Sequence, residues 1–466
     1  MVIYYLLITL TIMVFISYII FERDIMAPQF IACVVFTISV IGTLYNKNYW
    51  NVNLSWNTYF VIIGGLIIYI VTAIPVYYIY NYIKKNNIYK ISVEDKKNIL
   101  WKFNYINIPN WKIIIFIILS LISIVLYFVQ VRKIGGGNSW SESMYNYRME
   151  TAFGIINENN SMPFYISYLY QITVLSGYVL IYIAINNFIS TGKINKKILI
   201  LILISLASSL LNANRGEIIH FPISAVTLYY IMWHRKEGWN RSIGIKFIFK
   251  CIVSSLLILV IFISLRSVVG RTTTIDPLRN LMGYIGGSTE LLDLYLKSPI
   301  ESSKIWGKET FSGLNAFLAT KMGMTNLAYK SYSEFGFSTN GICVGNVYTA
   351  FRNYIYDFGY KGLIVLTCIH SLFYSIYYKN IKNKIQFKKV NSHNKVDFTI
   401  LIYSYIIYAV FLMFYADYFY VKYITMSMIK QLIFLKIICY FYVDSNKVYR
   451  MNTKKEVNYV KKNRND

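Results

Sequence analysis

The arginines of this chain are the residues whose chemistry first suggests a ligand. The chain has 12 arginines and 35 lysines, and the lysines gather in a different set of loops from most of the arginines. A guanidinium grips phosphate or carboxylate with two hydrogen bonds and stays charged when partly desolvated. Seven arginines border apolar segments or lie in one long connection: Arg132, Arg148, Arg215, Arg266, Arg271, Arg279 and Arg352. Together they predict an anion site, although any one of them could simply extend from a segment end to the membrane surface.

Arg215 has the most distinctive setting of the seven. It lies in the turn Asn212-Ala213-Asn214-Arg215-Gly216-Glu217, between two apolar segments. Ionisable residues at such positions are functional candidates, and a structural ion pair with Glu217 is the alternative. The five cysteines are scattered and offer neither a disulfide framework nor the spacing of a metal site.

Composition identifies the elements that must position these residues. The chain of 466 residues is 56% hydrophobic and only 15% charged, against about 25% charged for a soluble domain. We predict an all-α polytopic membrane protein with eleven, or at most twelve, transmembrane helices. The eleven apolar segments are 2–20, 29–45, 58–82, 111–131, 163–189, 196–211, 217–233, 246–265, 361–378, 398–416 and 423–443.

The net charge of +26 is explained by topology. When the loops are assigned alternately to two sides, 27 basic residues fall on one side and 6 in the short loops of the other. Cytoplasmic loops accumulate Lys and Arg, so we expect the amino terminus outside, the tail inside and no nucleic-acid partner. The predicted regions are an N-terminal bundle of about eight spans (1–265), an outer loop (266–360), about three C-terminal spans (361–443) and a basic cytoplasmic tail (444–466).

The outer loop 266–360 is the expected place for function, because connections of this length are usually functional. Its apolar residues suggest an interfacial helix lying on the membrane surface. These residues are Leu278, Leu281, Met282, Ile285, Leu291, Leu292 and Leu294.

The end of this loop resembles a known family. The stretch NVYTAFRNYIYDFGYKG, from Asn346 to Gly362, is similar to the signature of oligosaccharide repeat-unit polymerases, the Wzy-type O-antigen and capsular-polysaccharide polymerases. Ala27-Pro28, the Asn214-Arg215-Gly216 turn and Tyr284-Ile285-Gly286-Gly287-Ser288 with Asp293 and Tyr295 look similar in order and spacing.

The resemblance implies a reaction at the outer face of the bacterial cytoplasmic membrane. A growing glycan is transferred from undecaprenyl diphosphate onto a new lipid-linked repeat unit, and undecaprenyl diphosphate is released. No metal or other cofactor is expected, and the helical architecture would be that of lipid-dependent glycosyltransferases of the GT-C kind. A flippase and a chain-length regulator are further implied partners, beside the lipid-linked glycans and the bilayer.

The same resemblance suggests roles for individual residues. The groups expected to bind substrate or diphosphate are Arg215, Arg266, Arg271, Arg279, Arg352, Asn346, Tyr348 and Tyr284. The acceptor hydroxyl needs a base, and the order of preference is Asp357, Glu217, Glu290 and Asp293. Asp357 could instead cap the following helix, since aspartate accepts free backbone N–H groups. A histidine base is not expected, because 266–360 contains no histidine.

Two other classes of protein remain as alternatives. A flippase or transporter of lipid-linked oligosaccharide would predict inverted repeats and broken helices, and the sequence shows no such symmetry. An outer-face glycan ligase differs from a polymerase only in its acceptor, so the sequence separates these two poorly.

Overall fold

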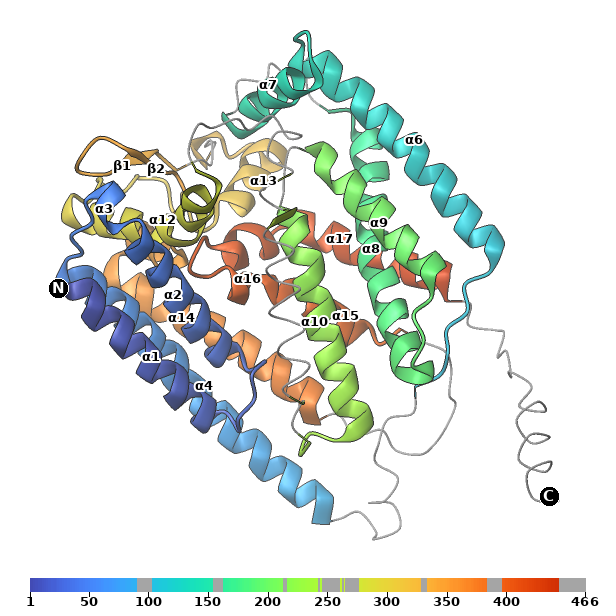
Figure 1. Ribbon diagram of the computed structural model, residues 1–466, viewed down its shortest axis with the longest axis horizontal. Helices are drawn as coiled ribbons and strands as arrows, with labels where there is room; N and C mark the ends of the chain where they lie inside the picture. Colours follow the sequence, from blue (N-terminus) through green and yellow to red (C-terminus); the bar gives the residue numbers. More distant parts are fainter. Residues whose placement is uncertain are drawn as a thin grey trace.

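The described part of the protein is a bundle of helices with almost no sheet (Figure 1). The computed structural model describes residues 1–89, 103–153, 162–212, 216–241, 276–327, 333–383 and 396–443, together with 244, 260, 261 and 264. The α-helices are α1 (Val2–Ile20), α2 (Pro28–Tyr45), α3 (Lys47–Trp50), α4 (Trp56–Tyr89), α6 (Asn110–Gly135), α7 (Trp140–Phe153), α8 (Phe164–Thr191), α9 (Lys196–Ser209), α10 (Gly216–Glu237), α12 (Pro277–Lys297), α13 (Ser312–Met322), α14 (Ala350–Asn383), α15 (Phe398–Ile406), α16 (Tyr408–Phe411) and α17 (Met426–Tyr442).

Short elements complete the described part of the chain. There are two 3-10 turns, η2 (Leu210–Asn212) and η3 (Thr325–Leu327), and a π-helical turn, η4 (Phe419–Tyr423). The strands β1 (Gly336–Phe337) and β2 (Cys343–Gly345) pair as an antiparallel hairpin. Among the described residues, six helices are long and apolar enough to cross a membrane: α1, α2, α4, α6, α8 and α14. This confirms an all-α membrane protein, while the total of eleven spans stays a prediction.

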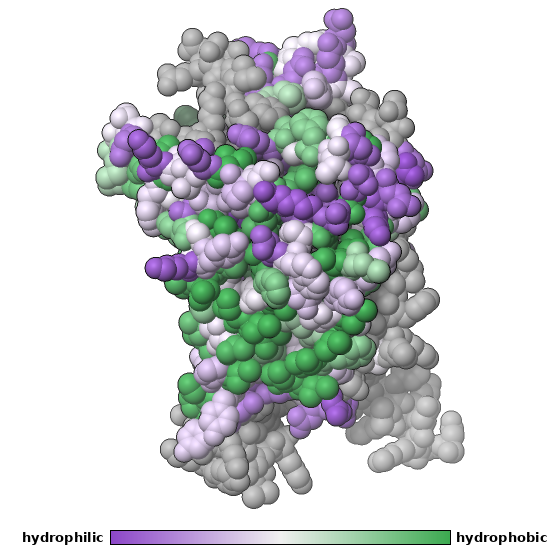
Figure 2. Space-filling model, turned by 90° about the vertical axis from the view of Figure 1, so that its left-hand side faces the viewer, coloured by the Kyte–Doolittle hydropathy of each residue, from purple (hydrophilic) through white to green (hydrophobic). Residues whose placement is uncertain are grey.

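The two ends of the bundle differ. Figure 1 shows α3, α7, α12, α13 and the β1–β2 hairpin at the upper end, which we call the loop end. The last turns of α4, α8 and α10 lie at the lower end. Figure 2 shows hydrophobic residues gathered below the loop end on the face in view, with hydrophilic residues above them. The described parts of three loops that were assigned to the outside by charge, around α3, around α7 and from α12 to β2, therefore share one end of the molecule.

Helix α12 lies in the predicted outer loop, and its C-terminal half is buried against the rest of the protein. It begins at an Asp276 cap that accepts the N–H of Arg279 at 2.9 Å, followed by Pro277, which suits a first helical position. Its apolar side chains Leu291 and Leu292 are buried. The helix packs along α2, because both helices carry small residues where they meet.

Gly286 of α12 and Gly42 of α2 allow this close approach. A Cβ atom built at Gly42 would lie 2.8 Å from the backbone nitrogen of Gly286, and one built at Gly286 would overlap the backbone of Thr43. The Thr43 hydroxyl donates to the carbonyl of Gly286 at 2.8 Å, and that of Ser39 donates to the carbonyl of Ile285 at 2.9 Å. Small residues and hydroxyls are what membrane helices use to pack closely.

We therefore expect Gly286→Ala to lower the thermal stability of the purified protein in detergent. The added methyl group must separate two backbones, and such overpacking costs about 1–3 kcal/mol. Gly64→Ala is the matched control, since Gly64 lies within helix α4 and a Cβ there meets nothing within 4 Å. Equal thermal midpoints for the two variants would contradict this account of the α2–α12 contact.

Helix α14 begins earlier than the apolar segment predicted at 361–378. It starts at Ala350, so Arg352 and Asp357 lie on a helix rather than in the outer loop. The run is kinked at Gly359, which has φ +64° and ψ −163°. Glycine adopts this left-handed backbone without a steric penalty, so the kink falls at that residue.

Candidate functional site

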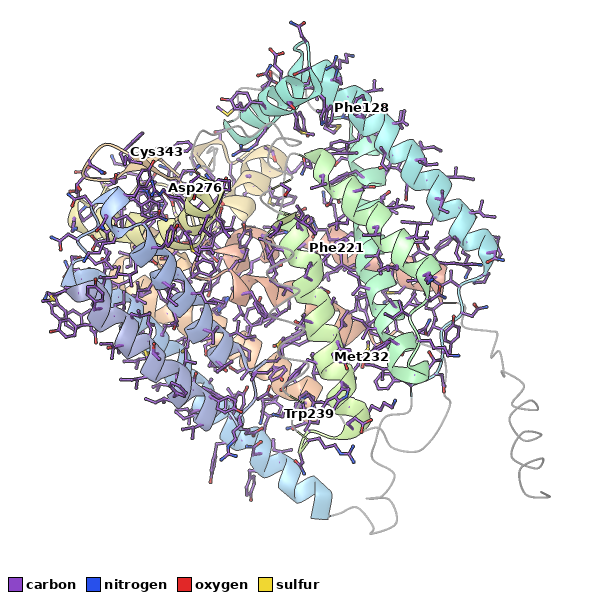
Figure 3. All side chains as sticks on the ribbon, viewed as in Figure 1. Phe128, Phe221, Met232, Trp239, Asp276 and Cys343 are labelled. Carbon is purple, nitrogen blue, oxygen red and sulfur yellow. The ribbon has the colours of Figure 1, made fainter. Side chains whose placement is uncertain are left out.

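A cavity of about 290 Å³ opens at the loop end. Residues far apart in the sequence line it: Asn46, Tyr49 and Trp50 before and within α3; Arg148 on α7; Arg279, Asn280, Gly283, Tyr284, Gly287, Ser288 and Leu291 on α12; Phe335, Cys343, Val344, Gly345, Asn346 and Val347 in and around the hairpin; and Tyr415. Figure 3 places Asp276 and Cys343 at this end, and Trp239 at the opposite one. The cavity is close to the lower limit of small-molecule pockets, roughly 300–1,000 Å³.

The described lining of the cavity carries two positive charges and no negative one. Arg148 and Arg279 are its cations, and among the described residues no Asp, Glu or His lines it. The Arg279 guanidinium stacks on the Tyr49 ring, 4.6 Å from its centroid. Arginine held against an aromatic face is oriented for bidentate contact with phosphate or carboxylate, so the cavity suits an anionic ligand.

Glycines on one face of α12 keep the cavity open. A Cβ atom at Gly283 would lie 3.6 Å from the Trp50 ring, and one at Gly287 would lie 3.4 Å from Val344. Any larger side chain at either position would occupy the space that the cavity now offers. Gly286 faces α2 instead. Of these two adjacent glycines, Gly286 allows the helices to pack closely and Gly287 keeps the cavity open.

Two buried polar side chains of the cavity wall have unused hydrogen-bonding capacity. Asn46 Oδ1 and Ser288 Oγ have no hydrogen-bond partner among the residues that the structure describes. A buried polar atom left without a partner costs about 1–3 kcal/mol. Both atoms are covered by neighbouring atoms, so they add polar character to the wall without presenting a hydrogen-bonding group to the cavity surface.

The structure brings together three of the predicted binding residues, because Arg279, Tyr284 and Asn346 all line the cavity. Arg215, Arg266 and Arg271 lie outside the described residues, so their positions relative to it stay open.

Tyr348 and Arg352 lie behind the cavity wall rather than in it. Arg352 is 2% exposed, and its guanidinium carbon lies 4.6, 4.8 and 5.0 Å from the ring centroids of Tyr348, Tyr356 and Tyr295. It also forms an ion pair with Glu309. A cation surrounded by three aromatic rings and a carboxylate is well compensated for its burial, and it ties α14 to α12 and to the segment before α13.

Asp357 does not cap the second half of α14. Its carboxylate accepts the backbone N–H groups of Glu309, at 3.1 Å, and Thr310, at 2.7 Å. The aspartate therefore fastens the segment before α13 onto α14. This contact also presents Glu309 to Arg352.

Asp293 and Glu290 lie on α12 but do not line the cavity. Asp293 Oδ1 accepts the N–H and the hydroxyl of Ser55, both at 2.7 Å, and the hydroxyl of Thr58 at 2.6 Å. Its other oxygen pairs with Lys297 at 2.6 Å. Asp293 thus holds the N-terminal turn of α4, whose free N–H groups favour a carboxylate.

Glu290 has an unusual protonation equilibrium. Burial, and to a smaller extent the charge of Asp293, raise its pKa from 4.5 to about 7 against the opposing effect of Lys297. Because the folded state binds this proton more tightly than the unfolded chain, the protein loses stability as pH rises from about 4.5 through 7.

We expect Glu290→Gln to flatten that dependence, and to gain stability over the wild type above pH 7. The shift corresponds to about 3 kcal/mol. Thermal midpoints measured in detergent between pH 5 and pH 8.5 test this, with the exposed Glu301→Gln as control. Parallel curves for the wild type and Glu290→Gln would be the contrary result.

Glu217 lies in a separate buried cluster at the start of α10. It accepts a short hydrogen bond from the Tyr178 hydroxyl, and its Oε2 is 3.5 Å from Nδ1 of His220. The other ring nitrogen of His220 donates to the carbonyl of Tyr405 at 2.7 Å. These contacts join α8, α10 and α15, and Glu217 is not among the residues that line the cavity.

The opposite end contains charged residues that the topology count treated only as loop charges. Lys379 and Lys382 bind Glu22 at 2.9 and 2.7 Å, and Lys382 also binds Asp24 at 2.9 Å. Tyr230 and Tyr378 donate to Asp24 as well. These lysines are buried and paired, so they connect α14 to the turn between α1 and α2.

Sequence reasoning missed three residues that matter here: Asn46, Ser288 and Glu309. Nothing in the sequence next to Asn46 marks it, since it meets α12 only through tertiary packing. Ser288 lies within the segment that carries the family resemblance. Its position directly after Gly287 was the one sequence feature that could have indicated a place in the cavity wall. Comparison with family models, with curated proteins and with solved structures finds no match to this chain.

Proposed function

We propose that this protein polymerises oligosaccharide repeat units that are linked to undecaprenyl diphosphate. In this reaction the growing glycan leaves its lipid diphosphate and joins the sugar end of a new repeat unit. The bond between the anomeric carbon and the phosphate oxygen breaks, the oxygen of an acceptor hydroxyl forms the new glycosidic bond, and undecaprenyl diphosphate is released. The proton of that hydroxyl passes to the leaving diphosphate or to water. The proposed location is the bacterial cytoplasmic membrane, with the loop end facing outward.

The observation that carries the proposal is the cavity with Arg148 and Arg279 at the loop end. Two guanidinium groups and no described carboxylate suit a diphosphate, whose negative charge builds up as it leaves. The ring of Tyr284 and the side chain of Asn280, which also line the cavity, suit the adjoining sugar. The resemblance of the 346–362 stretch to repeat-unit polymerases supports the same reaction.

Deletion of the gene, followed by analysis of the surface glycan, tests the proposal. The expected result is single repeat units on the cell surface in place of long chains, with long chains restored by the wild-type gene. Loss of all lipid-linked glycan from the outer face would contradict the proposal and favour a flippase. Normal long chains that remain on the lipid carrier would contradict it and favour a ligase.

A further inference from the structure

Trp306 presents an exposed aromatic surface at the loop end. Its side chain is 58% exposed. The indole lies parallel to the ring of Phe311, with centroids 4.8 Å apart and 2° between the planes, and Phe358 packs against it at 5.6 Å. Because Phe311 covers one face of the indole, the opposite face supplies much of the exposed area.

The segment that carries this ring is held firmly in place. Asn315 donates its side-chain N–H to the backbone carbonyl of Trp306 at 2.8 Å. The carboxylate of Asp357 accepts the N–H groups of Glu309 and Thr310, as described above. An exposed ring on a fixed backbone loses little conformational entropy when it binds a ligand.

A second exposed tryptophan at the same end shows a different setting. Trp56 is 51% exposed and starts the apolar helix α4, where it stacks on Tyr5 and lies beside Phe60, which is 64% exposed. Such a site is typical of the aromatic belt at a membrane surface. The segment around Trp306 is instead polar and charged, with Glu301, Lys304, Lys308 and Glu309. This difference argues that Trp306 faces water and a polar ligand.

We propose that Trp306, supported by Phe311, is a platform for a pyranose ring of the glycan. One face of a pyranose carries C–H groups with a weak positive charge, which complements the negative face of an aromatic ring. Its hydroxyl groups suit the polar side chains of the same segment. The choice of a glycan as the occupant rests on the function proposed above.

The platform lies within reach of the cavity. Asn346 lines the cavity, and Phe358, which contacts Trp306, follows it on the same short stretch of chain. That stretch spans at most about 25 Å. A short oligosaccharide whose diphosphate occupies the cavity could therefore place one of its sugars on Trp306.

Saturation-transfer NMR on the purified full chain in detergent tests the platform. The probe is the lipid-free oligosaccharide released by mild acid from the surface glycan of the cell that makes this protein. We expect Trp306→Leu, which keeps apolar packing on Phe311 but has no aromatic face, to bind the probe about tenfold more weakly, as for loss of one stacking contact. Trp306→Phe should keep most of the affinity, and Trp56→Ala should bind as the wild type does.

The outcomes separate the platform from the polymerase. Wild-type affinity in Trp306→Leu, or equal losses in Trp306→Leu and Trp56→Ala, overturns the platform and leaves the gene-deletion test of the polymerase untouched. Loss of affinity in Trp306→Leu alone, with its thermal midpoint unchanged and recovery in Trp306→Phe, supports the platform even if the deletion strain still makes long chains.

Discussion

Arg279→Ala should leave the protein in the membrane at its normal level and abolish long-chain polysaccharide. Arg279 is exposed at the cavity, where its guanidinium stacks on Tyr49 and forms no ion pair with a described residue. Its removal should therefore act on ligand binding. Loss of an oriented cation next to a leaving diphosphate costs about 10²–10³-fold in rate, by analogy with other preorganised donors. A gel of the surface glycan from a complemented deletion strain measures the outcome.

Two further variants make this prediction specific. Arg241→Ala removes an exposed arginine from the opposite end, where it pairs with Glu237, and should give normal chains. Arg279→Lys keeps the charge but loses the planar fork and its stacking, so it should give shorter or sparser chains. Normal chain lengths in Arg279→Ala, at normal expression, would contradict both the diphosphate site and the proposed function.

Arg352→Ala should unfold the loop end, and activity should be lost as a consequence. The substitution leaves the Glu309 carboxylate without its cation and removes a group that touches Tyr295, Tyr348 and Tyr356. Removing one partner of a buried ion pair costs about 3–5 kcal/mol. Thermal midpoints and limited proteolysis in detergent measure the loss, and cleavage should begin in the segment before α13.

A double substitution distinguishes a supporting role from direct ligand binding. Arg352→Met with Glu309→Gln removes both charges, so it should regain much of the stability that either single change loses. If Arg352 only supports the fold, the double variant should regain activity with its stability. A wild-type thermal midpoint in Arg352→Ala would show that the ion pair does not hold this end together.

The class of protein and most helices follow from local sequence. The apolar segments predicted at 2–20, 29–45, 111–131 and 163–189 coincide with α1, α2, α6 and α8. Such agreement is expected, because a backbone in a membrane must satisfy its own hydrogen bonds and therefore forms helices. The predicted segment at 246–265 lies almost entirely outside the described residues.

The positions of the carboxylates could not be predicted in this way. Asp293, Asp357 and Glu217 were chosen as bases for their residue type and their place in the chain. In the structure each one binds a group from another element: the start of α4, the segment before α13, and Tyr178 of α8. Whether a carboxylate holds a helix end or faces a ligand depends on the neighbour that packing brings to it.

The sequence by itself determined the helical membrane class, the separation of charge between the loops and the arginine chemistry that suits an anion. These properties depend on composition and on neighbours along the chain. Only the tertiary structure decided which arginines share a cavity, since Arg148 lies on α7 and Arg279 on α12, far apart in the chain. The close contact of Gly286 with Gly42 sets α12 against α2 and so brings Asn46 and Trp50 to the face of α12. No local pattern records that contact, because its energy arises from shape complementarity between segments that are far apart in the chain.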